Sequence, residues 1–308
     1  NDPLSMNGSS LLEDRIKLLN KIDKILFNSK WSQERFFIGI ENKILLKQKT
    51  SVCHQSTSRY NVDFKKKKKL ISFVGKLNSA KGYDIFGKAV LKILNKYNDW
   101  KAIVIGDEPR EKIFFKHKNL LIKGYTKHEE VLKILNKVSI SVVCSRWEEP
   151  FGRTSLEAAS RGCAVIISNR GGLPETAKNA LILKKVSSAD LITNIENLIL
   201  NKKKLINLQK QNYKNFIFDH KYISGLIDNI RIGLIPKKMF YISKDLNLKI
   251  MHITNFNDRF DGRLHYNTGR RLNNGFVRLG HNVLTVSDRD ILHNNKKLND
   301  LGGSKSLQ

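Results

Sequence analysis

The alternation of apolar and polar positions between residues 70 and 231 predicts repeated β-α units around a parallel sheet. Short apolar runs bounded by turn residues indicate buried strands, and the stretches between them place apolar residues at helical spacing. This order is typical of an α/β fold, in which helices cover a mostly parallel sheet. The expected strands are Leu70–Val74, Ala102–Ile105, Leu120–Lys123, Ile140–Cys144, Ala164–Ser168 and Ala180–Leu183, and the expected helices are Tyr83–Lys96, Glu129–Val138 and Thr154–Arg161.

The segment upstream of this region does not continue the pattern. Residues 1–64 show one amphipathic stretch, Leu11–Asn20, a short strand-like run, Lys24–Asn28, and a second helical stretch from Ser32. This is too little to form a domain by itself, so we interpret residues 1–64 as the end of an incomplete amino-terminal domain. A chain that begins at Asn1 instead of Met agrees with a fragment.

The segment downstream starts a new pattern. Residues 233–246 contain Gly233 and Pro236 and predict a linker. A strand-helix-strand order then indicates the beginning of a second, incomplete module in residues 247–308. Residues 65–232 between the flanks form the expected complete domain, a Rossmann-like parallel sheet of ordinary size. The elements expected in the second module are Leu248–Thr254, Tyr266–Leu279 and Asn282–Ser287.

Composition indicates a folded chain with a large positive charge. Hydrophobic residues make up 40% of the 308 residues, and no apolar run approaches the roughly 18 residues of a membrane-spanning helix. Fifty-six Lys and Arg against 28 Asp and Glu give a net charge of +28. This charge fits a nucleic acid or an anionic membrane surface, but it also fits a chain rich in lysine throughout. We favour the second interpretation because the lysines are scattered, and we interpret their one dense run, Lys65–Lys69, as a solvated linker.

The cysteines and the first residues of the chain indicate the cellular compartment of the protein. Cys53, Cys144 and Cys163 form no CxxC pair and are interpreted as reduced, buried thiols. Reduced thiols and the lack of a signal peptide predict a cytoplasmic protein. Its charge predicts a weak association with the inner face of the cell membrane, screened by salt.

The segment Glu149–Glu157, EPFGRTSLE, places two carboxylates between a buried strand and a helix. The helix is expected to begin near Gly152, and the N–H groups of its first turn, together with the positive end of its dipole, suit a phosphate. Glu157 lies about one turn inside that helix, where a carboxylate can accept both hydroxyls of a ribose. Glu149 lies in the loop and can accept hydroxyls of a second sugar across the diphosphate. Alternatively, Glu157 only stabilises the helix dipole and Glu149 is a solvated loop residue.

Two further segments follow predicted strands. Phe73–Gly82 ends a strand at Gly75 and places Lys76 and Lys81 on either side of a turn. Cations there can neutralise the charge that develops on a departing diphosphate. Asn169–Glu175, NRGGLPE, predicts a tight loop that opens a short helix. Because both segments follow strands, we expect them at the edge of the sheet where such folds bind ligands.

In this order and spacing, the three segments resemble the donor domain of the GT-B glycosyltransferases, specifically the retaining family-4 type (glycosyl transferases group 1). The resemblance covers about residues 66–231. In the family the position of Lys76 is usually Arg, and lysine keeps the charge but loses bidentate geometry. The matching motifs are Gly75-Lys76-Leu77 with Lys81-Gly82, Glu149 with Glu157, and Gly171-Gly172-Leu173-Pro174-Glu175.

The resemblance implies transfer of a sugar from a nucleoside-diphosphate sugar to a glycan or lipid-linked glycan, with retention and without a metal or other cofactor. It implies that Lys76 and Lys81 hold the diphosphate, that Glu157 holds the ribose and that Glu149 contacts the donor sugar. Phe151 and Gly152 offer backbone N–H groups, and Gly124 and Tyr125 line the nucleobase. The expected site residues are Lys76, Lys81 and Glu149 for catalysis, and Gly75, Gly124, Tyr125, Phe151, Gly152, Arg153, Thr154 and Glu157 for donor binding.

The flanks resemble the same family. Residues 11–40 look like the last part of an acceptor-side domain, and residues 248–290 look like the first part of such a domain in a second, tandem transferase. In that second part Gly262-Arg263 replaces the Gly-Gly loop often found in the family. A fragment of this kind is expected to bind the donor, while the acceptor is chosen by a domain that is mostly missing.

Two other function classes stay open. A basic nucleic-acid-binding protein is supported by charge alone, because the chain has neither RNP aromatics nor zinc fingers, and no nucleic-acid partner is expected. A GT-B relative that acts as a sugar-nucleotide epimerase, or an inactive binding module, would carry the same motifs.

Asp288-Arg289-Asp290 imitates a metal motif of another glycosyltransferase fold, but it lies outside the required context. The absence of GxxxxGK[ST] and GxGxxG loops excludes the usual ATPase and dehydrogenase motifs, and Ser155 lacks a hydrolase elbow.

Overall fold

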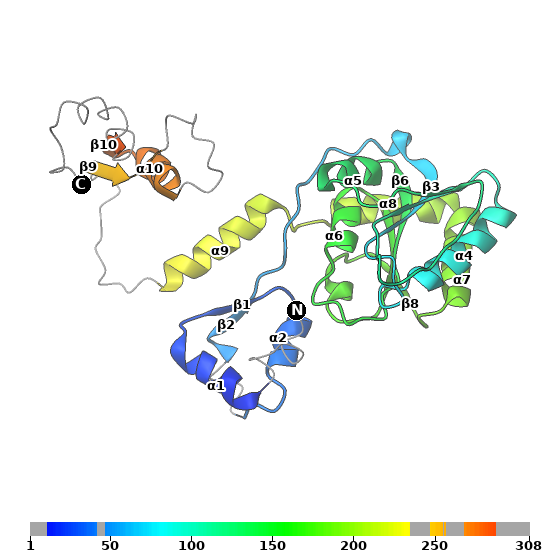
Figure 1. The fold of residues 1–308 in the computed structure, drawn as a ribbon, viewed down its shortest axis with the longest axis horizontal. Coiled ribbons are helices and arrows are strands. Elements are labelled where there is room, and N and C mark those ends of the chain that lie inside the picture. Colours follow the sequence, from blue (N-terminus) through cyan, green and yellow to red (C-terminus); the bar gives the residue numbers. More distant parts are fainter. Residues whose placement is uncertain (1–10, 42–46, 235–246, 255, 257–267, 288–308) are drawn as a thin grey trace, which may run out of the picture. The chain divides into compact units, whose positions relative to one another are not determined.

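The computed structural model describes residues 11–41, 47–234, 247–254, 256 and 268–287, which belong to two compact units, Asn1–Ile235 and Pro236–Gln308 (Figure 1). The first unit contains a six-stranded parallel sheet with strand order β5-β4-β3-β6-β7-β8. All six strands expected from the sequence are present, so the predicted α/β class is confirmed. Their bounds are β3 (Lys68–Val74), β4 (Lys101–Ile105), β5 (Leu120–Ile122), β6 (Val138–Val143), β7 (Ala164–Ser168) and β8 (Leu181–Leu183).

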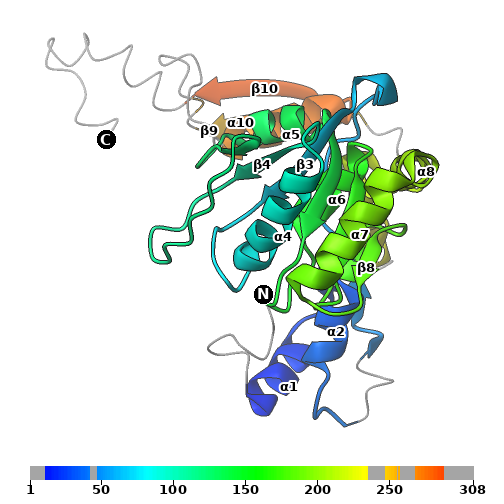
Figure 2. The same ribbon diagram turned by 90° about the vertical axis from the view of Figure 1, so that its right-hand side faces the viewer.

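Helices cover both faces of this sheet, and each strand sends alternate side chains to the two sides. In β4, Ala102 and Val104 enter one core, whereas Ile103 and Ile105 enter the other. Figure 2 looks onto the helices α4 and α7 of the first core. Burial on both faces explains why the strands appear in the sequence as near-continuous apolar runs. The first core is covered by α4 (Tyr83–Lys96), α7 (Ser188–Leu200) and α8 (Lys202–Lys214), and the second by α5 (His128–Leu135) and α6 (Arg153–Ser160).

Glycines join the carboxyl ends of β3, β4 and β5 into one edge. The N–H of Gly75 donates to the carbonyl oxygen of Ile105 at 3.0 Å, and the N–H of Gly106 donates to that of Gly124 at 2.9 Å. Gly106 has φ +133°, and a Cβ there would lie 1.9 Å from the carbonyl oxygen of Gly75. A side chain at Gly106 would therefore force these strand ends apart.

The lysine run Lys65–Lys69 is not a solvated linker throughout, and that interpretation was wrong. Its last two residues begin β3, while the first two lie in a short 3₁₀ turn, Phe64–Lys66. The Nζ of Lys67 turns inward, and burial lowers its pKa. It donates to three main-chain oxygens at the ends of elements on one side of the sheet, those of Leu135, Val138 and Arg161, at 3.2, 2.8 and 2.7 Å.

The amino-terminal segment folds around a small core of its own. Its helices α1 (Leu12–Lys21) and α2 (Lys30–Phe36) and the strand β1 (Ile25–Phe27) confirm the expected elements. The strand β2 (Thr50–Val52), which was not expected, pairs with β1 in parallel. The core of the segment consists of Leu19, Phe27, Phe36, Phe37 and Ile40.

The first unit ends with the helix α9 (His220–Leu234). None of the helices in the described ranges has both the length and the apolar composition needed to cross a membrane. Two of the three cysteines, Cys144 and Cys163, are buried as expected, and burial raises the pKa of Cys144 to about 12. Cys53 is only partly buried, which corrects the expectation for that thiol.

The second unit contains the expected strand-helix-strand order. The strands β9 (Lys249–Thr254) and β10 (Asn282–Ser287) pair in parallel, and α10 (Thr268–Arg278) connects them. Three expected features lie outside the described residues: the loop with Gly262-Arg263, the segment Asp288-Arg289-Asp290 and the first two residues of the expected helix.

Candidate functional site

The segment Glu149–Glu157 runs from the loop after β6 into α6, as expected. Gly152 is the N-cap residue, with φ +108°, and among the described residues no side chain accepts a hydrogen bond at this helix end. A Cβ on Gly152 would lie 2.4 Å from Cδ2 of Leu173, so the position requires glycine. The first N–H groups of α6 are therefore left for another acceptor, and the helix dipole favours an anion there.

Lys81 and Glu149, expected in different segments, form an ion pair at this place. Lys81 Nζ lies 2.5 Å from Glu149 Oε1, and the two side chains are 31% and 12% exposed. Lys81 sits in the turn that opens α4, where its N–H donates to Asn78 Oδ1 at 3.0 Å. The next residue, Gly82, has φ +76° and presses so closely on the end of β6 that a Cβ would lie 2.1 Å from the carbonyl oxygen of Cys144. The low exposure of Glu149 rules out the alternative of a solvated loop residue.

A second ion pair holds the turn of Lys81 against the loop of Glu149. Arg146 donates to both carboxylate oxygens of Asp84, at 2.6 and 2.7 Å. These hydrogen bonds lower the pKa of Asp84. The main-chain N–H groups of Arg146 and Trp147 both donate to the carbonyl oxygen of Ala80, at 2.9 and 3.0 Å. The Lys81–Glu149 pair thus rests on main-chain contacts that fix both partners.

Glu157 is buried in α6, with 5% of its surface exposed. Its Oε1 accepts hydrogen bonds from His128 Nε2 at 2.8 Å and from Arg153 Nη2 at 3.2 Å. Arg153 was an expected site residue, whereas His128 was not. The available signal was its position at the start of α5, shortly after Gly124 and Tyr125. Glu157 therefore does more than stabilise the helix dipole, because two basic side chains orient its carboxylate.

The remaining expected residues lie at the same carboxyl edge without joining these pairs. Lys76 is exposed and forms no ion pair with any residue that the structure describes. Tyr125 follows Gly124 and is 81% exposed, and Thr154 is half-buried in the first turn of α6. Phe151 is buried with its ring against His54 and Phe218, so its side chain belongs to a small core. Only the backbone of Phe151 can contribute to binding.

The Gly-Gly loop after β7 lies directly on the backbone of Glu149. The N–H of Gly172 donates to the carbonyl oxygen of Glu149 at 2.6 Å, and that of Gly171 donates to Glu148 Oε2 at 2.5 Å. Gly171 has φ +58°, and a Cβ there would lie 2.1 Å from the Glu149 carbonyl oxygen. The third segment therefore positions the loop that carries Glu149.

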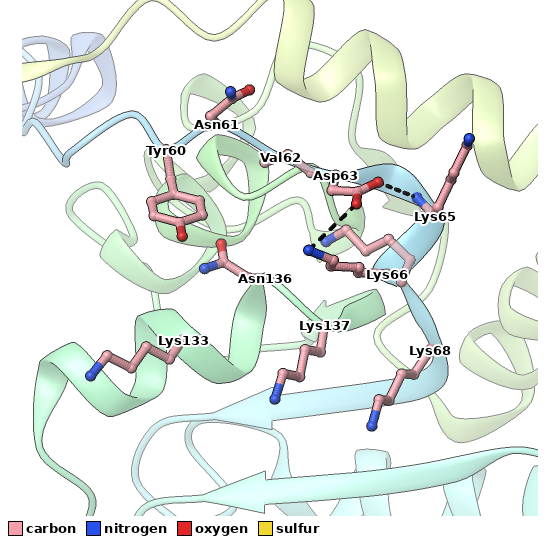
Figure 3. Close-up of a pocket in the computed structure, with 11 residues that line it drawn as sticks. Tyr60, Asn61, Val62, Asp63, Lys65, Lys66, Lys68, Lys133, Asn136 and Lys137 are labelled. Atoms are coloured by element: carbon pink, nitrogen blue, oxygen red, sulfur yellow. Dashed lines mark hydrogen bonds and ion pairs between the residues drawn. The ribbon is translucent and has the colours of Figure 1, made fainter.

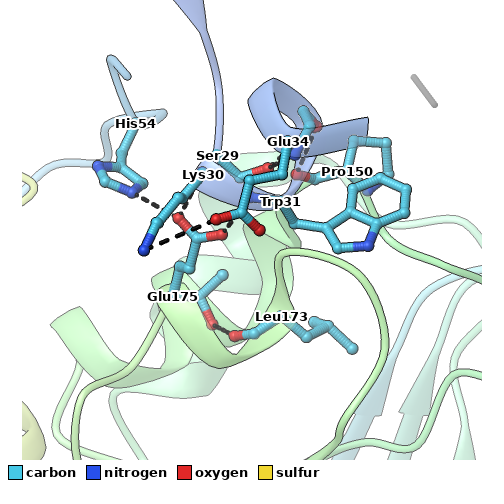
Figure 4. A network of polar contacts seen from close by, with 10 residues as sticks. Ser29, Lys30, Trp31, Glu34, His54, Pro150, Leu173 and Glu175 are labelled. Atoms are coloured by element: carbon cyan, nitrogen blue, oxygen red, sulfur yellow. Dashed lines mark hydrogen bonds and ion pairs between the residues drawn. The ribbon is translucent and has the colours of Figure 1, made fainter. Parts of the chain in front are cut away.

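Glu175, the last residue of that segment, has a role that the sequence did not indicate (Figure 4). Its carboxylate accepts from the N–H groups of Lys30 and Trp31, at 2.7 and 2.9 Å, at the start of α2. It also contacts His54 Nε2 at 3.1 Å. Burial alone would raise the pKa of Glu175, but the hydrogen bonds from His54 and the two N–H groups outweigh burial and lower it. Glu175 thus connects the Gly-Gly loop to the amino-terminal segment.

These features define a class of domain. Glycine-ended parallel strands, an uncapped helix start and an acid-lysine pair meet at the carboxyl edge of an open α/β sheet, the place where Rossmann-like domains bind phosphorylated ligands. Residues 54–215 match the family model of the glycosyl transferases group 1. This range covers more than half of the 308 residues, and the chain belongs to that family, as the motifs predicted.

Curated proteins of known sequence are similar to this chain over part of their length. The chain is 29% identical to spore coat protein SA of Bacillus subtilis over 132 residues, which cover 38% of this chain and 35% of that protein. It is 26% identical over 191 residues to the GPI3 subunit of phosphatidylinositol N-acetylglucosaminyltransferase of Saccharomyces cerevisiae, covering 56% of this chain and 42% of that protein. The chain thus spans less than half the length of these curated relatives.

Solved structures share the fold. Anabaena HepE superposes with a TM-score of 0.61 at 17% identity, over 72% of this chain and 67% of that one. The sheet and its helices therefore follow the GT-B architecture that the resemblance implied.

Proposed function

We propose that this chain binds a nucleoside-diphosphate sugar and serves the transfer of its sugar to an acceptor. The observation that carries the proposal is the Lys81–Glu149 pair, 2.5 Å apart, beside the uncapped start of α6. Membership of the glycosyl transferases group 1 supports the same function. The exposed Lys76 and the buried Glu157 complete the set of groups that a nucleotide sugar needs.

The diphosphate lies between the first N–H groups of α6 and the ammonium groups of Lys76 and Lys81. In the structure the Lys81 ammonium donates a hydrogen bond to Glu149 Oε1. A diphosphate carries more negative charge than a carboxylate, so it competes for Lys81 and releases the oxygens of Glu149. Glu149 then accepts hydroxyls of the donor sugar, which links diphosphate binding to sugar binding.

The nucleoside lies on the other side of the diphosphate. Glu157 accepts the ribose hydroxyls with the lone pairs that His128 and Arg153 leave available. The exposed ring of Tyr125 covers the base. Gly124, with φ +56°, provides the turn that places this ring beyond the end of β5.

Transfer is proposed to retain configuration and to need no metal ion, as the family resemblance implies. The bond from the anomeric carbon to the diphosphate oxygen breaks, and a bond to the acceptor oxygen forms on the same face of the sugar. The acceptor's proton passes to the departing phosphate oxygen. Lys76, Lys81 and the start of α6 stabilise the charge on the leaving diphosphate.

The acceptor and the flanking parts are proposals of the same kind. A glycan or lipid-linked glycan, reached at the inner face of the cell membrane, fits the family and the charge of +28. We assign residues 1–64 to the acceptor-side domain, residues 65–232 to the donor domain and residues 247–308 to the start of a second module. The parallel β9–β10 pair with α10 is the strand-helix-strand unit that such a module begins with.

Nucleotide titration tests the proposal. UDP, GDP and ADP are titrated calorimetrically into the full chain, with UDP first because HepE structures contain UDP and UDP-glucose. Glu157→Ala is expected to weaken binding at least tenfold, from the about 1.5–3 kcal/mol of a hydrogen bond to a charged group. Glu196→Ala is the matched control, because it removes the ion pair of 2.8 Å between Glu196 in α7 and Lys96 in α4. This variant should bind the nucleotide as the parent does.

Product analysis with a radiolabelled donor then separates transfer from epimerisation and from binding without turnover. Failure of all three nucleotides to bind, or equal binding by Glu157→Ala and Glu196→Ala, would overturn the assignment.

A further inference from the structure

A pocket lies where β3 and β6 begin, at the end of the sheet opposite the candidate site (Figure 3). It has a volume of about 750 Å³ and is lined by residues 60–63 and 65–68 and by Lys133, Asn136 and Lys137 at the end of α5. The seven residues of β3 separate it from the donor site, roughly 20 Å at about 3.3 Å per residue. The proposed donor therefore cannot reach it.

Of the six lysines that line this pocket, Lys66 alone has an acidic partner among the residues that the structure describes. Figure 3 shows Lys68, Lys133 and Lys137 extending along the same side of the pocket. They are close neighbours in the fold, because the N–H of Lys68 donates to the carbonyl oxygen of Lys137 at 2.8 Å, and Lys133 precedes Lys137 by four residues. The ammonium group of Lys66 is paired with Asp63, 3.7 Å away.

Lys68, Lys133 and Lys137 are exposed and together form a positively charged side of the pocket. Lys133 lies in α5, Lys137 lies in the turn before β6, and Lys68 begins β3, and like charges on neighbouring residues repel one another. An anion between Lys68, Lys133 and Lys137 would relieve the repulsion.

The opposite wall offers a ring and an amide. The half-exposed ring of Tyr60 is held by the buried guanidinium of Arg161, 5.1 Å from the ring centroid. Arg161 in turn donates to Ser58 Oγ at 2.8 Å. Asn136 Oδ1 is buried and has no hydrogen-bond partner within the described part of the chain. Figure 3 shows the Asn136 amide directed toward Tyr60. A hydroxyl group on a ligand that moved this amide slightly would satisfy that oxygen.

We infer that this pocket binds a phosphate-bearing ligand with hydroxyl groups, at a site separate from the donor site. The phosphate lies among Lys68, Lys133 and Lys137, and the hydroxylated part lies against Tyr60 and Asn136. The same chemistry occurs in a free phosphorylated polyol and in the headgroup of a phospholipid. The inference does not depend on the proposed glycosyl transfer.

Lysine footprinting on the full chain tests the site directly. Acetylation of each lysine is measured by mass spectrometry with increasing glycerol 3-phosphate, and separately with vesicles that contain phosphatidylglycerol in phosphatidylcholine. Saturable protection of Lys68, Lys133 and Lys137 is expected with at least one probe. Protection by the free probe identifies a soluble ligand, and protection by the vesicles alone identifies a lipid headgroup. Lack of protection by both probes would overturn the inference.

A matched pair of double variants separates this site from general charge attraction. Lys133→Gln with Lys137→Gln is compared with Lys88→Gln and Lys92→Gln, two exposed lysines at the same spacing on α4, which covers the other face of the sheet. The pocket variant should bind the effective probe about 25-fold more weakly, at roughly fivefold per lysine. The α4 variant should stay within about twofold of the parent. Equal losses in the two variants would show that only net charge matters and would reject the site.

The donor site provides an internal check. The affinity for the nucleoside diphosphate should be the same in the pocket variant and the parent, because that site lies at the other end of β3. A change in nucleotide affinity as large as the change in probe binding would mean that both measurements report one site, and the inference would fail.

Discussion

Replacing Glu149 by Gln is expected to strengthen the binding of a free nucleoside diphosphate while it slows sugar transfer. The Lys81 ammonium forms an ion pair with the Glu149 carboxylate, with Nζ 2.5 Å from Oε1. A diphosphate must displace this carboxylate to reach Lys81. The neutral amide of Gln keeps the shape of the side chain but holds the ammonium group less strongly. The substitution therefore frees Lys81 for the diphosphate and removes an acceptor for the donor sugar.

The size of the effect follows from the geometry of the pair. A hydrogen bond to a charged group contributes about 1.5–3 kcal/mol. The Lys81 side chain is 31% exposed, so solvent screening favours the lower end of that range. About 1.5 kcal/mol corresponds to roughly tenfold tighter binding of the free diphosphate. Calorimetry with the best-binding nucleoside diphosphate, and turnover with the matching nucleotide sugar, measure the two effects separately.

The distinctive outcome is that Glu149→Gln raises the affinity for the free diphosphate and lowers the rate of sugar transfer. If Glu149→Gln weakened free diphosphate binding as much as it weakened nucleotide-sugar binding, competition for Lys81 would be refuted. Lys81→Gln is the control, because it removes the cation itself and should weaken the binding of both ligands. Unchanged binding in Lys81→Gln would remove that lysine from the site.

Three further predictions concern the structure around the site. Glu175→Gln should cost about 1 kcal/mol in urea unfolding, since a charged cap of α2 is lost. Because the folded-state pKa of Glu175 is lowered, its contribution is complete above the ordinary value of 4.5 and is lost as pH falls through the folded value, so parent and variant should converge in acid. Gly82→Ala should cost at least about 2 kcal/mol at φ +76°, whereas Gly225→Ala, in open space within α9, should gain about 0.5–1 kcal/mol. Lys67→Met removes a donor from three main-chain oxygens, of which those of Leu135 and Val138 keep the weak donor Cys163 Sγ, and should cost about 2 kcal/mol in thermal unfolding.

Each of these three has a clear contrary result. A constant stability difference between parent and Glu175→Gln across the acid range would show that the carboxylate charge does not stabilise α2. Equal unfolding midpoints for the two alanine variants would contradict the close approach of Gly82 to β6. A Lys67→Met protein with the melting temperature of the parent would mean that water satisfies the three carbonyl groups.

Most of the sheet could be predicted because its inner strands, such as β4, β6 and β7, are buried on both faces. Such strands are continuous apolar runs, and β7 (Ala164–Ser168) was predicted with its exact bounds. The strand β2 (Thr50–Val52) was missed because it has three residues and a single large apolar side chain. The helix α8 (Lys202–Lys214) was hidden because it buries polar residues, Gln209 and Asn212, among its leucines. Polar groups in a core become visible only when their hydrogen-bond partners are known.

The candidate site could be predicted where its chemistry is local. The uncapped start of α6 follows from Gly152 and the residues next to it, so the sequence suffices. The partners of the carboxylates could not be predicted, because they come from distant parts of the chain. His128 is 29 residues from Glu157, and Lys81 is 68 residues from Glu149. The sequence shows which groups are able to pair, and the order of the strands decides which of them meet.

The contacts around Glu149 connect the amino-terminal segment to the proposed donor site through two neighbouring loops, those after β6 and β7. The helix α2 contacts this region twice, because Ser32 Oγ donates to the carbonyl oxygen of Pro150 at 3.2 Å and the first N–H groups of α2 donate to Glu175. Glu175 and the two glycines before it belong to the loop that bonds the Glu149 backbone at 2.6 Å. A displacement of α2 would therefore be transmitted to the carboxylate proposed to hold the donor sugar, through hydrogen bonds to both neighbouring loops. With the amino-terminal segment proposed to belong to the acceptor-side domain, these hydrogen bonds are the physical path by which it would affect the orientation of the proposed donor.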